Sequence, residues 1–293
     1  MPRFARHWND PRLDTTVFIA VIAAAVMHAG WNVIVKLRLD RLLALTLIQG
    51  LMGLFGIAMI FAFPWPAAAS IPFALASGVL HTGYNLFLAR SYRTGDMGQV
   101  YPIARGTAPA MAVLGAFVFT GEALGWRALA GLAVLVAGIW LIAMRGGRGA
   151  LKLDRRTLLF ALGTSGFISA YTITDGLGGR ASHSASAYTG LVYLLDAVML
   201  VASVLALRGQ SALATMAPFW KSGLFGAALS GTAYWIVIWA MTVAPIGAVA
   251  ALRETSVLFA VLLSTLFLGE PLTRWRIAGA VLIVAGAALL KLG

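Results

Sequence analysis

Five charged residues stand inside long apolar stretches of the chain, where burying a charge is costly and a charge is therefore usually functional. They are Arg105, Asp175, Asp196, Arg253 and Glu254. An arginine in such a place can bind a substrate carboxylate, anchor helix ends or extend to a membrane interface, and for Arg105 all three roles stay open. A buried acid can carry a proton or pair with a cation. We therefore interpret the three acids and Arg253 as charges that serve either coupling or structural pairing.

The spacing of these charges limits how they can pair. Neighbours on a helix point about 100° apart, so we expect no ion pair between Arg253 and Glu254. Asp196 has no Lys or Arg within two helical turns, so a charged partner must come from another helix. None of the acids by itself establishes an antiport mechanism.

Aromatic and amide side chains recur in the same stretches, where they could line a cavity. Aromatic residues in membrane proteins often form belts at the two interfaces. Tyr84, Tyr234 and Trp235 fall at mid-span positions that a belt does not explain. A helix face with Pro102 and Pro109 suits a cavity wall, because the carbonyls that proline leaves unpaired can be satisfied there. The predicted cavity residues are Trp31, Asn32, His81, Tyr84, Asn85, Tyr101, Pro102, Arg105, Tyr171, Tyr234, Trp235 and Trp239. Such a lining suits an apolar or aromatic zwitterion.

The sequence lacks the motifs of metal sites, of known intramembrane enzymes and of nucleic-acid binding. The chain has no cysteine, and its four histidines form no spaced metal site, so we expect no metal and no cofactor. Neither an HExxH motif nor a paired GxGD-like aspartate is present, which makes an intramembrane enzyme the least favoured reading. A net charge of +12 could suit nucleic acid, but no long basic run is present, and we expect no such partner.

The elements that must position these residues are membrane spans. Of the 293 residues, 60% are hydrophobic and 11% charged, with a mean hydropathy of +0.88, which is too apolar for one soluble core. Charges and turn residues divide the chain into ten predicted helices of about 17–23 residues each. They are 15–35, 42–63, 71–93, 98–119, 125–144, 157–177, 186–207, 222–243, 246–268 and 274–291. The first is too long for the apolar core of a signal peptide, so we expect it to be retained.

The chain contains a duplication. Residues 105–140 and 253–288 align at a constant offset of 148, with 14 of 36 positions identical. Five helices followed by five would give two repeats of opposite orientation, an arrangement typical of alternating-access transporters. Fourteen Lys and Arg follow the odd-numbered spans and six lie on the opposite side, which predicts that both termini lie on the side opposite the cytoplasm.

The duplicated segment also carries paired Gly-Glu dipeptides and spaced glycines. A glycine that closes one helix and a glutamate at the start of the next explain Gly121–Glu122 and Gly269–Glu270 better than a proton relay does. Glycines seven residues apart suggest close helix packing, within the chain or in a dimer. They are Gly131, Gly138, Gly279 and Gly286.

The pattern Arg…Pro…"FTGEAL"…Gly…"VAGIW", repeated as Arg…"FLGEPL"…Gly…"VAGAA", resembles the two EamA domains of the drug/metabolite transporter superfamily. The resemblance implies ten helices and the movement of small metabolites. Over its whole length the chain is also similar to YddG-type exporters of aromatic and other amino acids. It departs from a symmetric pattern at one point, because Gly106 follows the first arginine and Glu254 the second.

The fold predicted from these observations is an all-α membrane protein of ten helices in two inverted EamA repeats. Its predicted divisions are a tail (1–14), a first repeat (15–144), a basic loop (145–156) and a second repeat (157–293). The predicted function is export of amino acids, aromatic and other neutral ones among them, or of related small metabolites by alternating access. The expected place is the lipid bilayer of a bacterial cytoplasmic membrane, with periplasmic termini, a monomer sufficient and a dimer possible. Alternatives are a multidrug or nucleotide-sugar carrier, a channel, or an intramembrane enzyme.

Overall fold

The structure, a computed structural model, describes residues 13–34, 39–94, 97–145 and 155–293, and all of their regular structure is helical. The α-helices are α1 (Thr15–Ile34), α2 (Arg41–Ala62), α3 (Ile71–Thr94), α4 (Met97–Thr120), α5 (Trp126–Arg145), α6 (Arg155–Ala181), α7 (Ala185–Arg208), α8 (Ser211–Met216), α9 (Trp220–Val243), α10 (Ile246–Arg253), α11 (Ser256–Leu268) and α12 (Arg274–Leu292). Short 3₁₀ turns lie at η2 (Ala68–Ser70) and η3 (Ala217–Phe219).

Many large apolar side chains of the bundle face outward, which indicates a membrane as its surroundings. Seven helical segments in the described residues are long and apolar enough to cross a bilayer. Large apolar side chains on the outer surface are strongly exposed, with Phe61 at 86% and Leu266 at 75%, whereas a set of serines, threonines and charged groups is buried inside. Lipid satisfies an apolar exterior, so the chain is a multi-pass membrane protein.

Three of the predicted spans are not among these seven segments. Helices α3 and α4 have 24 residues each and α6 has 27, yet none is among the seven apolar segments. The described apolar part of α4, Ala104–Thr120, is shorter than a membrane span, and α3 and α6 contain more polar residues, among them His81, Asn85 and Asp175. Ten crossings therefore stay a prediction.

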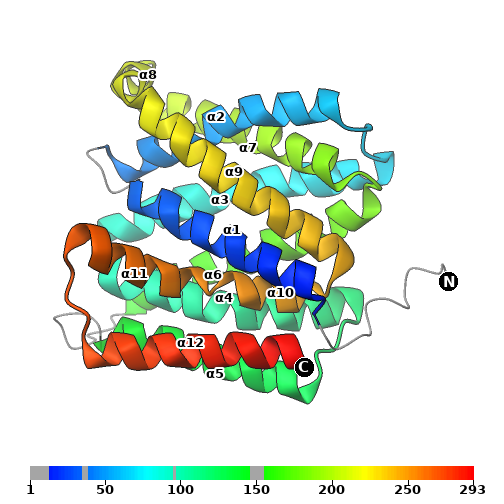
Figure 1. The fold of residues 1–293 in the computed structure, drawn as a ribbon. Coiled ribbons are helices and arrows are strands. Elements are labelled where there is room, and N and C mark those ends of the chain that lie inside the picture. Colours follow the sequence, from blue (N-terminus) through cyan, green and yellow to red (C-terminus); the bar gives the residue numbers. More distant parts are fainter. Residues whose placement is uncertain (1–12, 35–38, 95–96, 146–154) are drawn as a thin grey trace.

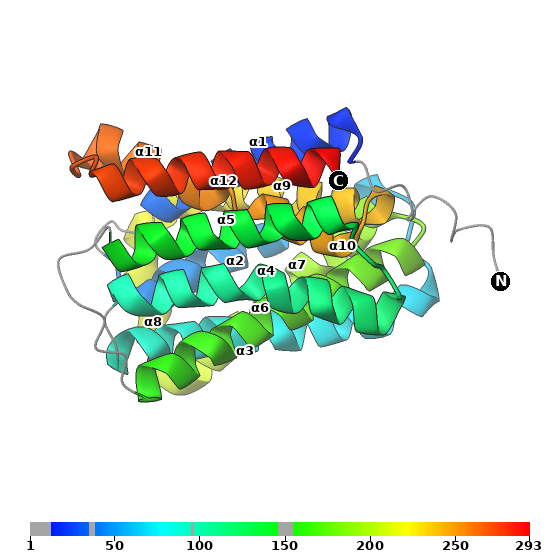
Figure 2. The same ribbon diagram turned by 90° about the horizontal axis from the view of Figure 1, so that it is seen from below.

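The helices run between two ends of the bundle. Helix α1 begins and α12 ends at the same end, which we call the terminal end (Figures 1 and 2). The pair α5–α12 forms one edge of the molecule, and α2 lies against α7 on the far side (Figure 1). Between them, α1 packs on α9 and α11, while α6 packs on α3 and α4.

Glycines set the close approach of α5 to α12. A methyl group on Gly138 would lie 2.7 Å from the carbonyl oxygen of Gly279, and one on Gly131 would lie 2.8 Å from that of Gly286. Small residues allow such backbone contact where lipid gives no hydrophobic drive for association. Both glycine faces are thus occupied within one chain.

The structure differs from the expected spans in two places. The stretch predicted as one helix over 246–268 is broken at Glu254 and Thr255, where i→i+3 hydrogen bonds tighten the turn between α10 and α11. A short helix, α8, occupies a stretch predicted as loop, because Ala212 and Met216 find a buried contact there.

Candidate functional site

A cavity of about 80 Å³ lies at the centre of the bundle, with residues from eight helices in its wall. The lining residues are His28, Trp31, Leu45, Ile48, Gln49, Met52, His81, Tyr84, Asn85, Arg105, Tyr171, Val192, Tyr193, Asp196, Ser230, Tyr234 and Arg253. One water needs about 10–15 Å³ of such space, and ligand pockets usually offer about 300–1,000 Å³. In this form the cavity therefore has room for a few waters.

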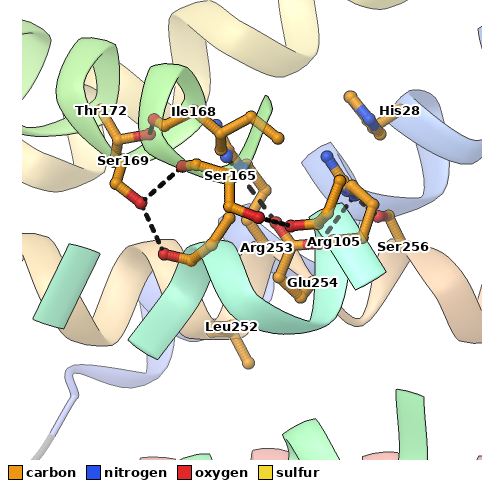
Figure 3. Close-up of polar contacts among 12 residues, drawn as sticks. His28, Arg105, Ser165, Ile168, Ser169, Thr172, Leu252, Arg253, Glu254 and Ser256 are labelled. Carbon is orange, nitrogen blue, oxygen red and sulfur yellow. Dashed lines mark hydrogen bonds and ion pairs between the residues drawn. The ribbon is translucent and has the colours of Figure 1, made fainter. Parts of the chain in front are cut away.

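Arg105 forms the main ion pair beside the cavity. Its Nε lies 2.8 Å from Oε2 of Glu254, and one of its terminal nitrogens donates to Ser256 Oγ at 2.7 Å. Figure 3 shows the arginine of α4 directed at the break between α10 and α11. Arg105 and Glu254 are 4% and 1% exposed, so each neutralises a charge that the other would otherwise leave buried.

A second guanidinium, that of Arg253, converges on the same carboxylate. A terminal nitrogen of Arg253 lies 3.7 Å from Oε1 of Glu254, so the expectation that these neighbours do not pair is wrong. The expectation assumed a continuous helix, whereas α10 ends at Arg253 and Glu254 already belongs to the turn. Arg253 also lies 6.0 Å from the centre of the Tyr171 ring, a cation–π distance.

Serines of α6 hold α4 in place behind Arg105. Ser165 Oγ donates to the carbonyl of Ala104 at 3.0 Å, and Ser169 Oγ donates to that of Ala108 at 2.9 Å (Figure 3). These interhelical hydrogen bonds flank Arg105 along α4. They fix the helix that presents the arginine, although Pro109 interrupts its own hydrogen-bond ladder.

Asp175 lies behind the cavity wall and is tied by hydroxyl groups. It is fully buried and accepts hydrogen bonds from Tyr188 at 3.2 Å and from Tyr234 at 2.5 Å. His81 Nε2 lies 4.0 Å from the same carboxylate, and the His81 ring stacks on Tyr171 at 4.1 Å. The acid thereby positions two aromatic rings that face the cavity.

Asp196 reaches the cavity from α7 and has a neutral partner. Gln49 Nε2 of α2 donates to Oδ2 of Asp196 at 2.7 Å. The other oxygen, Oδ1, has no hydrogen-bond partner in the part of the chain that the structure describes. The partner does come from another helix, but it is an amide and not a cation.

The structure brings most of the predicted site residues together. Those that line the cavity are Trp31, His81, Tyr84, Asn85, Arg105, Tyr171, Asp196, Tyr234 and Arg253. Glu254 and Asp175 hold lining residues through direct contacts. Tyr101 and Pro102 lie on α4, but their side chains fall outside the described part of the structure.

Three predicted residues lie away from the cavity. Asn32 donates to the backbone carbonyl of His28 on its own helix at 2.8 Å. Trp235 donates to Ser186 Oγ at 3.0 Å and contacts Phe63, and Trp239 packs against the largest apolar core cluster. All three side chains are half-buried, and the helix faces that they occupy point away from the cavity.

Sequence reasoning passed over several lining residues. Gln49 stands in the long apolar run of α2, and that isolation was a usable signal. Tyr193 lies one helical turn before Asp196 on α7, and its hydroxyl donates to the carbonyl of Gly231. The apolar lining residues could not be predicted from the sequence, because apolar residues also face lipid on these helices. They are Leu45, Ile48, Met52 and Val192.

The terminal end carries a buried ion pair between the two halves of the chain. Glu122 pairs with Arg180 at 2.5 Å and accepts a hydrogen bond from the backbone N–H of Ile246, the first residue of α10. Arg180 in turn donates to the carbonyls of Met241 and Ala244. Glu122 was expected to stabilise the start of the helix that follows it, but it caps α10 instead.

The second Gly-Glu copy is used differently. Gly121 and Gly269 both have positive φ, 71° and 65°, as helix-closing glycines do. Glu270 pairs with Arg276 at 2.7 Å near the start of α12 and is 37% exposed. The glycine of the dipeptide therefore ends a helix in both halves. The glutamate connects the two halves only in the first copy, at Glu122.

A larger hollow, of about 390 Å³, lies on the outer surface between α5 and α12. Its residues are Trp126, Arg127, Ala130, Leu289 and Leu292. A hollow with an almost entirely apolar lining on a lipid-exposed edge suits an acyl chain. The central cavity, with its convergent charged and aromatic groups, is the better candidate for the functional site.

A multi-pass helical bundle with a charged, aromatic-lined cavity at its centre is an architecture that membrane transport proteins have. The EamA-like transporter family model matches residues 15–144 and 155–292, so the chain belongs to the EamA-like transporter family. Membership makes it a transporter of the drug/metabolite transporter superfamily. A solved structure described only as "Crystal structure of protein" is similar in fold, with a TM-score of 0.73 and 16% identity over 96% of this chain and 98% of that one. Comparison with curated proteins gave no match.

Proposed function

We propose that this transporter exports amino acids, aromatic and other neutral ones among them, across the bacterial cytoplasmic membrane. The observation that carries the proposal is the central cavity, where tyrosine, tryptophan and histidine rings lie beside Arg253 and Asp196. Aromatic rings suit an apolar side chain, and groups of both charge signs suit the two ends of a zwitterion.

Alternating access between two inverted repeats is the mechanism we propose, with halves at 15–144 and 157–293. The helix contacts support it, because exchanging the halves maps the most extensively packed helix pairs onto one another or onto themselves. The pair α1–α9 becomes α6–α3, and α3–α7 becomes α9–α2, while α2–α7 and α5–α12 map onto themselves. The break between α10 and α11 beside the cavity agrees with the discontinuous helices that transporters use at their sites.

The size of the cavity supports a carrier better than a channel. At about 80 Å³ it is too small for an aromatic amino acid, so the surrounding helices must separate before substrate enters. A channel alternative needs a continuous passage of substrate width. A carrier needs only alternate openings toward the two ends.

The charges of the cavity favour an amino acid over a phosphorylated substrate. A nucleotide sugar needs several cationic groups for its phosphates. Of the two arginines that line the cavity, Arg105 is already engaged with Glu254 and Ser256. Multidrug carriage remains the alternative, because apolar drugs suit aromatic walls equally well.

We place both termini in the periplasm and propose that one chain suffices for transport. The basic side chains Arg41, Arg208 and Lys221 lie at the end opposite the terminal end, as the positive-inside rule requires of the cytoplasmic side. The glycine faces of α5 and α12 are occupied within the chain, so a dimer would need another surface.

Counterflow in liposomes tests the proposed function. Vesicles that contain the purified protein are loaded with one unlabelled amino acid at a time, at equal pH on both sides, and uptake of labelled phenylalanine is followed. We expect accumulation with neutral amino acids, lost at least tenfold in Tyr84→Ala. Trp126→Ala, which removes a 74% exposed ring outside the cavity, is the matched control and should transport normally. Absence of counterflow for every amino acid, with folded protein, would move the assignment to drugs or sugars.

A further inference from the structure

Asp196 differs from the other buried carboxylates in how its charge is compensated. The described residues contain four buried acids, namely Glu122, Asp175, Asp196 and Glu254. Glu122 and Glu254 are paired with arginines, and Asp175 accepts hydrogen bonds from two tyrosines and has His81 beside it. Asp196 has a single amide donor, and its Oδ1 is without a partner among the described residues.

The unpartnered oxygen belongs to a side chain of the cavity wall. Asp196 is 4% exposed and lines the central cavity. Burying a carboxylate without a cation is costly, because the site must replace the hydration that water would have given. A cation that enters the cavity would remove that cost, so the site is preformed for a positively charged group.

The surroundings of Asp196 suit an organic ammonium. Trp31, Tyr84 and Tyr193 line the same cavity, and all three contact one apolar cluster that includes Met52 of α2. Aromatic faces attract ammonium groups, and a primary amine can donate a hydrogen bond to a carboxylate oxygen.

A second unpartnered group in the cavity wall is a hydrogen-bond donor and suits an anionic group. Asn85 is 1% exposed, and its Nδ2 donor has no partner within the described residues. With Arg253 it offers donors to an acceptor such as a carboxylate. The unpartnered oxygen of Asp196 and the unpartnered amide of Asn85, in the wall of one cavity, complement the ammonium and the carboxylate of a zwitterion.

The helix pair that carries Asp196 and Gln49 is held rigidly. Gly56 of α2 packs so closely on Gly190 of α7 that a single methyl group would collide with the Gly190 carbonyl. Gly53 packs in the same way on Ala197, the residue next to Asp196. Backbone contact fixes the hydrogen bond between Gln49 and Asp196, which aligns the carboxylate before a ligand arrives.

We propose that Asp196, oriented by Gln49, binds the ammonium group of the transported molecule and thereby selects amines over molecules without an amino group. The proposal rests on the proposed function in that it names how the same cavity recognises its substrate. Arg253 and Asn85 bind the carboxylate end, and the aromatic rings contact the side chain.

The test uses Asp196→Asn, whose amide oxygen can still accept the hydrogen bond from Gln49. In the counterflow assay we expect phenylalanine transport to fall at least tenfold. We also titrate purified protein with 2-phenylethylamine, which lacks the carboxylate, and with 3-phenylpropanoate, which lacks the amine. The variant should lose at least tenfold in affinity for the amine and keep its affinity for the acid. Glu270→Gln, which removes a carboxylate far from the cavity, should change neither affinity.

The outcomes separate this proposal from the proposed function. Wild-type protein that transports no amino acid but binds 2-phenylethylamine through Asp196 would refute the proposed function and support the ammonium site. The ammonium site alone would be overturned if wild type and Asp196→Asn transport phenylalanine equally and bind the amine with equal affinity. If Asp196→Asn does not fold, Gln49→Met replaces it, and unchanged amine affinity in that variant overturns the proposal.

Discussion

At the scale of single residues, the two arginines beside the cavity depend on one carboxylate. Glu254 lies 2.8 Å from Arg105 and 3.7 Å from Arg253, so its removal leaves two buried guanidinium groups without their negative partner. The hydroxyl of Ser256 contributes only one hydrogen bond to Arg105. The negative charge of Glu254 therefore stabilises both arginines, and a single hydrogen bond cannot replace it.

Glu254→Gln should lower stability by about 3–5 kcal/mol, the usual cost of breaking a buried ion pair from one side. Ser256→Ala should cost less, about 1.5–3 kcal/mol, because it removes one hydrogen bond to a charged group and no charge. Thermal denaturation of both purified variants measures the difference. Equal midpoints for the two variants would show that the carboxylate does not hold the site together.

The two tyrosines on Asp175 form a matched pair. Tyr188 and Tyr234 both donate to this carboxylate, but only Tyr234 also lines the cavity. Tyr188→Phe and Tyr234→Phe should each cost about 1.5–3 kcal/mol of stability. Only Tyr234→Phe should also raise, by several-fold, the phenylalanine concentration that gives half-maximal counterflow. An equal shift in both variants would assign the effect to Asp175 and not to the cavity surface.

At the scale of elements, glycine decides how closely helices pack. Gly138 and Gly279 face one another across α5 and α12 at backbone contact distance, whereas Gly166 of α6 has no atom within 4 Å of the position of a Cβ. The same residue type thus has a packing role in one helix and none in another.

Gly138→Ala should lower stability by about 1–3 kcal/mol, because the added methyl group has no space between the helices. Gly166→Ala should be neutral or stabilising by up to about 1 kcal/mol, since it lowers the flexibility of the unfolded chain. Melting curves of the two proteins in the same detergent provide the check. A stable Gly138→Ala protein would contradict the close contact between α5 and α12.

The two Gly-Glu copies allow the same sequence change to be compared in two settings. Glu122→Gln should cost about 3–5 kcal/mol, because Arg180 is largely buried and loses its partner. Glu270→Gln should cost about 0–1 kcal/mol, because its ion pair with Arg276 is partly exposed. Unfolding temperatures of both variants decide this, and a larger effect at Glu270 would contradict the assigned roles.

The duplication predicted the similar placement of the two glycines but not the different use of the two glutamates. The sequence pattern describes local geometry, so Gly121 and Gly269 could be assigned to helix ends. Glu122 meets Arg180 and Ile246 only because the second half of the chain packs beside the first. Likewise, the mid-span position of Trp235 suggested a cavity residue, whereas the direction in which Trp235 and Trp239 point depends on neighbours that no local pattern encodes.

At the scale of the whole molecule, contacts between the two halves hold the terminal end together. The ion pair of Glu122 with Arg180 is one such contact, and the backbone hydrogen bond from Ala67 to Ser182 at 2.9 Å is another. For substrate to reach the central cavity from this end, these contacts must separate.

Joining the halves at this end should stop transport. The chain has no cysteine, so Ala67→Cys with Ser182→Cys introduces the only two thiols. A short reducible thiol cross-linker should lower counterflow at least tenfold, and reduction should restore it, while each single variant stays unaffected by the reagent. Full transport by the cross-linked protein would show that the terminal end does not open.

The pairing of α5 with α12 also sets a condition on how the protein is made. The two helices lie 129 residues apart in the chain, from Arg145 to Arg274. At about 5–20 residues per second, a ribosome needs on the order of ten seconds to synthesise that interval. During that time the glycine face of α5 is already in the bilayer without its partner. This edge of the bundle can therefore be completed only after α12 has been synthesised and inserted.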